Sequence, residues 1–143
     1  MEVNIKKYLG KWYEIARIPN IFEPIMTGVT TEYTLNDDGS IKIINSGYVR
    51  GEFKTIEGKG LLTDQNDLLK VTFNGNTYSD YKILAVTSDY SYSLVGGEKS
   101  SSGLYNLWIL GRTNSIPKDV IDLFYTIARE KGYNPDWLKI TQD

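Results

Sequence analysis

The side chains that could do chemistry in this chain of 143 residues are carboxylates, lysines, tyrosines and serines, because the sequence contains no histidine and no cysteine. Without cysteine there is no thiolate nucleophile, disulfide or zinc–thiolate site. Without histidine, the usual general base, metal ligand and proximal haem ligand are missing, and a Ser-His-Asp triad cannot form. We therefore expect no cofactor, no metal site and no catalytic residues, and binding is the favoured class of function.

Composition and charge exclude further classes of protein. Hydrophobic residues make up 41% and charged residues 24% of the chain, as in an ordinary globular domain. A net charge of −2 does not favour a nucleic-acid partner, which calls for a basic surface. Every apolar run falls short of the ~20 residues that span a membrane as a helix. The length fits a single domain over residues 1–143.

Stretches of alternating apolar and polar residues, separated by turn signals, predict eight strands. Their ranges are 12–18, 29–36, 41–48, 55–63, 68–73, 81–87, 92–97 and 104–112. Sequential strands with short hairpins favour an all-β, up-and-down antiparallel barrel, since closure removes exposed sheet edges. Alternation alone leaves a β-sandwich open.

Beyond the last predicted strand, the apolar period lengthens, which predicts one amphipathic helix over about 117–131. Pro117 suits a first helical turn, Ser115 suits an N-cap and Gly132 suits the position after the helix. The apolar stripe consists of Val120, Leu123, Phe124, Ile127 and Ala128. Because such a helix is marginal alone, we expect its stripe to cover the outside of the barrel. A short strand over about 137–141 is expected to follow.

Three motifs occur in order along these elements. Gly10-Lys11-Trp12 opens the first strand, Ser88-Asp89-Tyr90 separates the sixth and seventh, and the eighth ends at Arg112. With the helix after it, this set resembles the lipocalin family over about residues 8–141. It is similar in particular to the bacterial outer-membrane lipocalins, and also to apolipoprotein D and the plant temperature-induced lipocalins. The resemblance implies a barrel over about 10–112 that binds, stores or transports a small lipophilic ligand.

A fatty acid or a lysophospholipid is the ligand that the resemblance implies, with a role in membrane maintenance. The signature residues are interpreted as builders of the fold: Gly10, Trp12, Asp89, Tyr90 and Arg112. We expect Trp12 to close the narrow end of the barrel, and Arg112 to stack on its indole while donating to backbone carbonyls.

Alternation counted from Trp12 and Arg112 gives the predicted ligand-binding residues. Tyr33, Asn45 and Trp108 come first, because they match pocket positions of similar lipocalins, and a buried Asn or Tyr needs hydrogen-bond partners. The others are Glu14, Ala16, Thr31, Leu35, Ile43, Val71, Phe73, Tyr81, Ile83 and Asn106. Also placed facing inward are Ile18, Val29, Ile41, Leu69, Ala85 and Leu110. The apolar members fit a packed interior without ligand equally well.

The predicted loop over 20–28 crosses the open end of the barrel. Its apolar residues Phe22, Ile25 and Met26 suit a lid, a patch for peripheral membrane contact, or packing on the rim. The start of the chain has neither an apolar signal region nor a lipidation cysteine. Two locations stay open: outer membrane or periplasm for a mature lipoprotein segment, and cytoplasm or a membrane periphery otherwise.

Two alternative functions also stay open. A lipocalin-fold enzyme acting on a lipid would have to use Glu14 or Lys59 inside the barrel, since enzymatic lipocalins of the prostaglandin synthase kind depend on a cavity cysteine. A scaffold would act through protein contacts or dimerisation. A ligand carrier is expected to be a monomer or a weak homodimer.

Overall fold

The computed structural model describes residues 2–19, 26–99 and 103–141. The strands are β1 (Gly10–Arg17), β2 (Met26–Leu35), β3 (Ile41–Val49), β4 (Glu52–Leu62), β5 (Leu68–Thr72), β6 (Ser79–Val86), β7 (Tyr92–Lys99), β8 (Tyr105–Gly111) and β9 (Lys139–Ile140). The helices are α1 (Ile5–Tyr8), α2 (Lys118–Glu130) and the 3₁₀ turn η1 (Pro135–Trp137).

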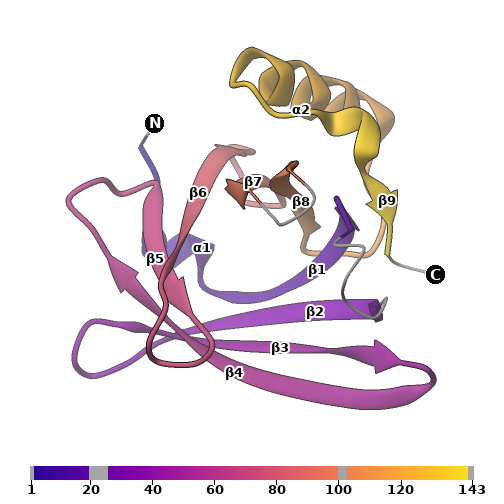
Figure 1. The fold of residues 1–143 in the computed structure, drawn as a ribbon. Coiled ribbons are helices and arrows are strands. Elements are labelled where there is room, and N and C mark those ends of the chain that lie inside the picture. The colour runs from indigo at the N-terminus through magenta and orange to yellow at the C-terminus, as the bar shows by residue number, and fades with distance from the viewer. Residues whose placement is uncertain (1, 20–25, 100–102, 142–143) are drawn as a thin grey trace.

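Strands β1 to β8 close into an antiparallel barrel. Each pairs with its neighbours in the sequence, and β1 pairs with both β8 and β2. Trp12 lies opposite Thr31 across one side of β1, and Tyr13 lies opposite Gly111 across the other. Figure 1 shows the strands curving round to meet, with α2 on the outside. The predicted fold, a closed barrel with one C-terminal helix and a short terminal strand, is confirmed.

The seam between β1 and β2 is completed by the C-terminal segment. β1 pairs with β2 only as far as Tyr13, and beyond that point β9 lies against β1. Thr141 bridges the two edges: its N–H donates to the carbonyl of Ile15 over 3.0 Å, and its own carbonyl accepts from the N–H of Gly28 over 2.9 Å. The Thr141 hydroxyl also donates to the Glu14 carbonyl at 2.9 Å.

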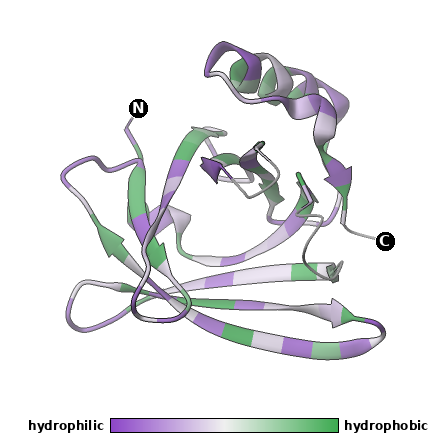
Figure 2. Cartoon of the chain, viewed as in Figure 1, coloured by the Kyte–Doolittle hydropathy of each residue, from purple (hydrophilic) through white to green (hydrophobic). Residues whose placement is uncertain are grey.

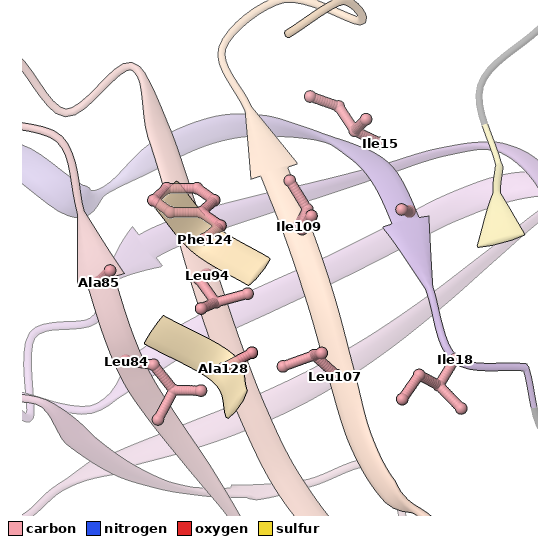
Figure 3. Close-up of a cluster of buried hydrophobic side chains, with 10 residues drawn as sticks. Ile15, Ile18, Leu84, Ala85, Leu94, Leu107, Ile109, Phe124 and Ala128 are labelled. Atoms are coloured by element: carbon pink, nitrogen blue, oxygen red, sulfur yellow. The ribbon is translucent and has the colours of Figure 1, made fainter. Parts of the chain in front are cut away.

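Helix α2 covers the outer face of β6, β7 and β8. Figure 2 shows apolar and polar residues alternating along it, and Figure 3 shows Phe124 and Ala128 lying over Leu94 and Leu107. Helix α2 ends at Glu130, and Gly132 takes the predicted position after the helix, where its φ of 90° lets the N–H of Tyr133 reach back to the Ala128 carbonyl at 2.9 Å.

The predicted N-cap of α2 at Ser115 is wrong. The helix begins one residue later than expected, so Pro117 itself takes the N-cap position and no side chain caps the helix. The Ser115 carbonyl instead accepts a hydrogen bond from the hydroxyl of Tyr92 at 3.1 Å.

Other boundaries also differ from the prediction: β1, β4 and β6 begin two or three residues earlier than expected, and β7 ends two residues later. Residues 26–28, expected in a loop, form the start of β2, whereas the rest of that loop, with Phe22 and Ile25, lies outside the described residues. Trp137 belongs to η1 rather than to the terminal strand, because the Asn134 side chain caps a turn there by accepting from the N–H of Asp136 at 3.1 Å. Helix α1 was not predicted.

The narrow end of the barrel is closed by α1, Trp12 and Arg112. Trp12 is fully buried, and its indole N–H donates to the Tyr8 carbonyl at 2.8 Å. The Arg112 guanidinium lies over the indole, as predicted. Within the described ranges, none of the helices has the length and apolar character needed to cross a membrane.

Candidate functional site

The barrel encloses a cavity of about 410 Å³ above the closed end. Its walls combine apolar and aromatic side chains with a few polar ones, and Phe73, which is 41% exposed, lies at its rim. The lining residues are Glu14, Arg17, Ile18, Thr31, Tyr33, Ile43, Asn45, Val71, Phe73, Ser79, Asp80, Tyr81, Val95, Asn106, Trp108 and Leu110. The volume lies within the range of roughly 300–1,000 Å³ that is typical of small-molecule sites.

Most of the residues predicted to bind a ligand do line this cavity. They are Glu14, Thr31, Tyr33, Ile43, Asn45, Val71, Phe73, Tyr81, Asn106 and Trp108. Ile18 and Leu110, which were counted as inward, line it too. Contact of these residues with a ligand stays a prediction.

A β-bulge in β1 overturns the predicted position of Ala16. Glu14 pairs with Leu110, but Ala16 pairs with the very next residue along β8, Ile109, so the register shifts at Ile15. Beyond the bulge the alternation is reversed. Ala16 therefore joins the cluster beneath α2, and Arg17 lines the cavity opposite Trp108.

A second bulge in β6 has the same effect. Ile83 pairs with Val95, whereas Ala85 pairs with Leu94, so the extra residue is Leu84. Ala85, predicted to face inward, lies beneath α2. Ile83 does face inward but packs with the closed-end cluster around Trp12 and stays outside the cavity lining.

Leu35 is also wrongly placed by alternation. β1 begins at Gly10, opposite Tyr33, so β2 continues past the end of its neighbour and Leu35 is 42% exposed. Ile41 and Leu69 are buried inside the barrel but do not line the cavity. Val29 is likewise buried outside the lining.

Of the described residues that line the cavity, four were missed. Arg17 was hidden by the bulge, which leaves no sign in the alternation. Ser79 and Asp80 precede the predicted start of their strand, and Val95 could have been found by pairing the seventh strand with Ile83.

The upper wall of the cavity carries a charged pair and a neutral pair. Glu14 is buried and accepts hydrogen bonds from Nε and Nη2 of Arg17, the second at 2.7 Å. The Thr31 hydroxyl donates to Oδ1 of Asn45 at 2.8 Å, which leaves the Asn45 amide nitrogen beside the cavity. These groups could orient a polar head group, while the apolar and aromatic lining takes an acyl chain.

The floor of the cavity is made of tyrosines. Tyr33 and Tyr81 line it, with their hydroxyl oxygens 2.7 Å apart, and the Tyr81 hydroxyl is 3.0 Å from that of Tyr8 below. Burial raises the pKa of Tyr8 to about 12 and raises the pKa values of Tyr33 and Tyr81 well above the ordinary tyrosine value. All three are therefore neutral hydroxyls at physiological pH.

The remaining signature residues build the closed end and line no part of the cavity. Asp89 accepts hydrogen bonds from the Thr87 hydroxyl at 2.9 Å and the Ser91 N–H at 3.1 Å, which lower its pKa. The Tyr90 hydroxyl accepts from the N–H of Asn4 at 2.9 Å, which holds the chain before α1.

Lys59 does not enter the cavity, contrary to the enzymatic alternative. It lies on the outer face of β4, where its Nζ is 3.9 Å from Oδ2 of Asp38. In the part of the chain that the structure describes, no group of three or more Asp or Glu residues is arranged to hold a metal ion.

Comparison with known proteins agrees with this architecture. The sequence profile of the lipocalin-like domain matches residues 3–143. Outer membrane lipoprotein Blc of Vibrio cholerae is 34% identical over 146 residues, which cover 99% of this chain and 83% of that protein. Temperature-induced lipocalin-1 of Arabidopsis thaliana is 34% identical over 144 residues, covering 92% of this chain and 75% of the relative. Lobster apocrustacyanin A1 shares the fold with a TM-score of 0.80 at 18% identity, over 98% of this chain and 79% of its own.

Proposed function

This chain belongs to the lipocalin family, and from that premise we propose that its cavity binds and carries an amphiphile with one long acyl chain, a fatty acid or a lysophospholipid. Lipocalins bind small hydrophobic molecules. The proposal adds the chemical class of the ligand, and the shape and lining of this cavity support it.

One observation carries the proposal: a cavity of about 410 Å³ with an apolar body and polar groups near the rim. Val71, Val95 and Leu110 offer apolar wall to an acyl chain, and each buried methylene contributes about 0.8 kcal/mol of binding free energy. Glu14 and Arg17 together present opposite charges, which suits the zwitterionic head of a lysophospholipid as well as a carboxylate.

The test is to identify what the purified protein holds and to titrate it with lipid. Native mass spectrometry and lipid extraction identify any co-purified amphiphile, and fatty acid is then added to delipidated protein while tryptophan fluorescence is followed. Trp108 lines the cavity, whereas Trp137 is 53% exposed outside the barrel. Quenching should survive in Trp137→Phe and disappear in Trp108→Phe. Absence of bound lipid and of quenching by any amphiphile would refute the proposal.

Exchange of this ligand with a membrane is part of the proposal. The turn between β3 and β4 lies at the open end of the barrel, because β1 runs from the closed end to Arg17 and β3 runs the same way. Tyr48 and Phe53 flank that turn, are 47% and 61% exposed, and stack edge to face with ring centroids 5.4 Å apart. Exposed aromatic rings of this kind favour the interfacial region of a bilayer. Loss of vesicle co-sedimentation in Tyr48→Ser/Phe53→Ser, with fatty-acid affinity unchanged, is the expected result.

Binding is proposed in preference to catalysis or to scaffolding. Glu14 is held by Arg17 and by the Thr141 hydroxyl at 3.3 Å, and Lys59 lies outside the barrel. Hydrolysis of a lipid ester that disappeared in Glu14→Gln would establish an enzyme. Light scattering with and without lipid tests the scaffold alternative, since we expect a monomer or weak dimer in both.

A further inference from the structure

The tyrosine floor of the cavity belongs to a longer chain of hydroxyl groups. From the cavity downward it runs from Tyr33 to Tyr81 at 2.7 Å, from Tyr81 to Tyr8 at 3.0 Å, and from Tyr8 to Oγ of Ser93 at 2.8 Å. Ser93 is fully buried and donates in turn to the backbone carbonyl of Ala85 at 3.3 Å.

The last acceptor favours one direction for the whole chain. A carbonyl oxygen can only accept, so Ser93 gives its single proton to Ala85 and must accept from Tyr8. The distances alone allow either direction, but because each hydroxyl has one proton, keeping the Ser93–Ala85 bond requires that Tyr8 accept from Tyr81 and Tyr81 from Tyr33. The opposite direction would require Ser93 to withdraw its proton from the Ala85 carbonyl.

This direction leaves the Tyr33 oxygen able to accept one more hydrogen bond. Its only proton goes to Tyr81, and a phenol oxygen can accept as well as donate. Among the described residues no group donates to the Tyr33 oxygen, although the side chain is 5% exposed and lines the cavity. The deep end of the cavity therefore presents a buried hydrogen-bond acceptor and no spare donor from its tyrosines.

We propose that the deep end of the cavity selects an amphiphile with a neutral hydrogen-bond donor, above all a hydroxyl group, at the end that enters first. The inference rests on the proposed function, because it specifies the ligand of the same cavity. A hydroxyl can donate to the Tyr33 oxygen and complete the chain. A carboxylate or ester entering first would set acceptor against acceptor, so the acidic head of a fatty acid stays at the rim.

Pairs of fatty acids that differ only at the far end of the chain test this directly. Dodecanoic, tetradecanoic and hexadecanoic acids are each compared with their ω-hydroxy counterparts, by calorimetry on the delipidated full chain. A pocket without a partner for the hydroxyl must bind the ω-hydroxy acid more weakly, because that group loses its water. Here we expect the ω-hydroxy acid of matching length to bind about three- to tenfold more tightly than the plain acid.

Three variants locate the effect. Tyr33→Phe should abolish the preference, and its thermal unfolding curve shows whether the variant is folded. Tyr92→Phe is the matched control, since it removes a tyrosine hydroxyl bonded to Ser115 outside the barrel, and should keep the preference. Ser93→Ala removes the group that sets the direction of the chain and should reduce the preference.

The outcomes separate this inference from the proposed function. If both acids bind and the plain acid is preferred at every length, the inference is overturned. It is also overturned if Tyr33→Phe prefers the ω-hydroxy acid as strongly as the unmodified protein does. Either result leaves the proposed function as a lipid carrier standing. An unchanged preference in Ser93→Ala overturns the directional argument and with it the inference. Binding of neither acid overturns both proposals.

Discussion

The guanidinium carbon of Arg112 lies 3.7 Å from the centroid of the Trp12 ring. The same guanidinium donates to backbone carbonyls on both sides of the closed end: Lys7 at 2.9 Å, Leu9 at 3.0 Å, Lys11 at 2.9 Å and Tyr90 at 3.1 Å. One side chain thus ties α1 and β1 to the turn before β7, beneath the cavity.

Arg112→Lys should lower the free energy of unfolding by about 2–4 kcal/mol, because one ammonium group cannot serve these diverging carbonyls or stack as a plane on the indole. Urea denaturation measures the change. Arg129→Lys is the control, since Arg129 forms an exposed ion pair with Asp136 and its replacement should cost within about 0.5 kcal/mol. Equal losses in the two variants would contradict the assigned role of Arg112.

Stability should fall in alkali. The pKa of Tyr8 is about 12 in the folded protein, above the ordinary tyrosine value near 10, so the unfolded chain releases this proton first. The contribution of neutral Tyr8 to the free energy of unfolding is complete below about pH 10. It is lost as the pH rises from there to about 12, a change of about 2–3 kcal/mol. Unfolding free energies measured across this range check the slope, and Tyr8→Phe should make it shallower, while Tyr33 and Tyr81, whose pKa values burial also raises, keep part of it. A slope of the opposite sign would exclude a buried neutral Tyr8.

Affinity should rise with acyl chain length and then level off. Each methylene that fits in the cavity of about 410 Å³ should tighten binding by about fourfold, from about 0.8 kcal/mol of transfer free energy. Calorimetry on a series of saturated fatty acids gives the length at which the gain stops. A gain that continues without limit would indicate micelle-like association rather than a bounded site.

Two adjacent glycines separate the cavity from the outer core. A Cβ on Gly97 would lie 3.0 Å from ring carbons of Trp108, whereas a Cβ on Gly96 would lie 2.5 Å from the ring of Tyr133 outside the barrel. Gly97→Ala should therefore shift the Trp108 emission and weaken fatty-acid binding by several-fold.

Gly96→Ala is the counterpart, expected to lower the melting temperature while leaving affinity unchanged in the folded protein. Loss of affinity in Gly96→Ala alone would mean that the two faces of β7 are assigned the wrong way round.

The sequence predicted the barrel well because its signals are local. Alternation, turn residues and the apolar stripe of α2 each depend on neighbours a few positions apart, and the motifs around Trp12 and Arg112 selected a barrel over a sandwich. The predicted inward or outward direction of a single side chain was correct only where its strand alternates regularly. An extra residue at Ile15 or at Leu84 reverses the assignment that follows it, Ala16 in β1 and Ala85 in β6, and nothing in the composition of either strand marks it.

The polar chemistry of the cavity was predicted only in part for the same reason. Asn45 and Tyr33 were expected inside the barrel, but their hydrogen-bond partners come from segments distant in the sequence. Tyr8 lies in a four-residue helix too short to show periodicity, and Arg17 was not among the residues predicted to face inward. Hydrogen-bond direction at the floor depends on Ser93, a residue type that carries no sequence signal of its own.

The bridge made by Thr141 has a consequence for synthesis of the protein. Its contact with Glu14 spans 127 positions, so the edges of β1 and β2 beyond Tyr13 stay unjoined until the segment that carries β9 and Thr141 has left the ribosome. Contacts of such long range form late, after the hairpins. A nascent chain stalled short of β9 therefore exposes two strand edges, which makes it a substrate for chaperones and proteases that the finished barrel is not.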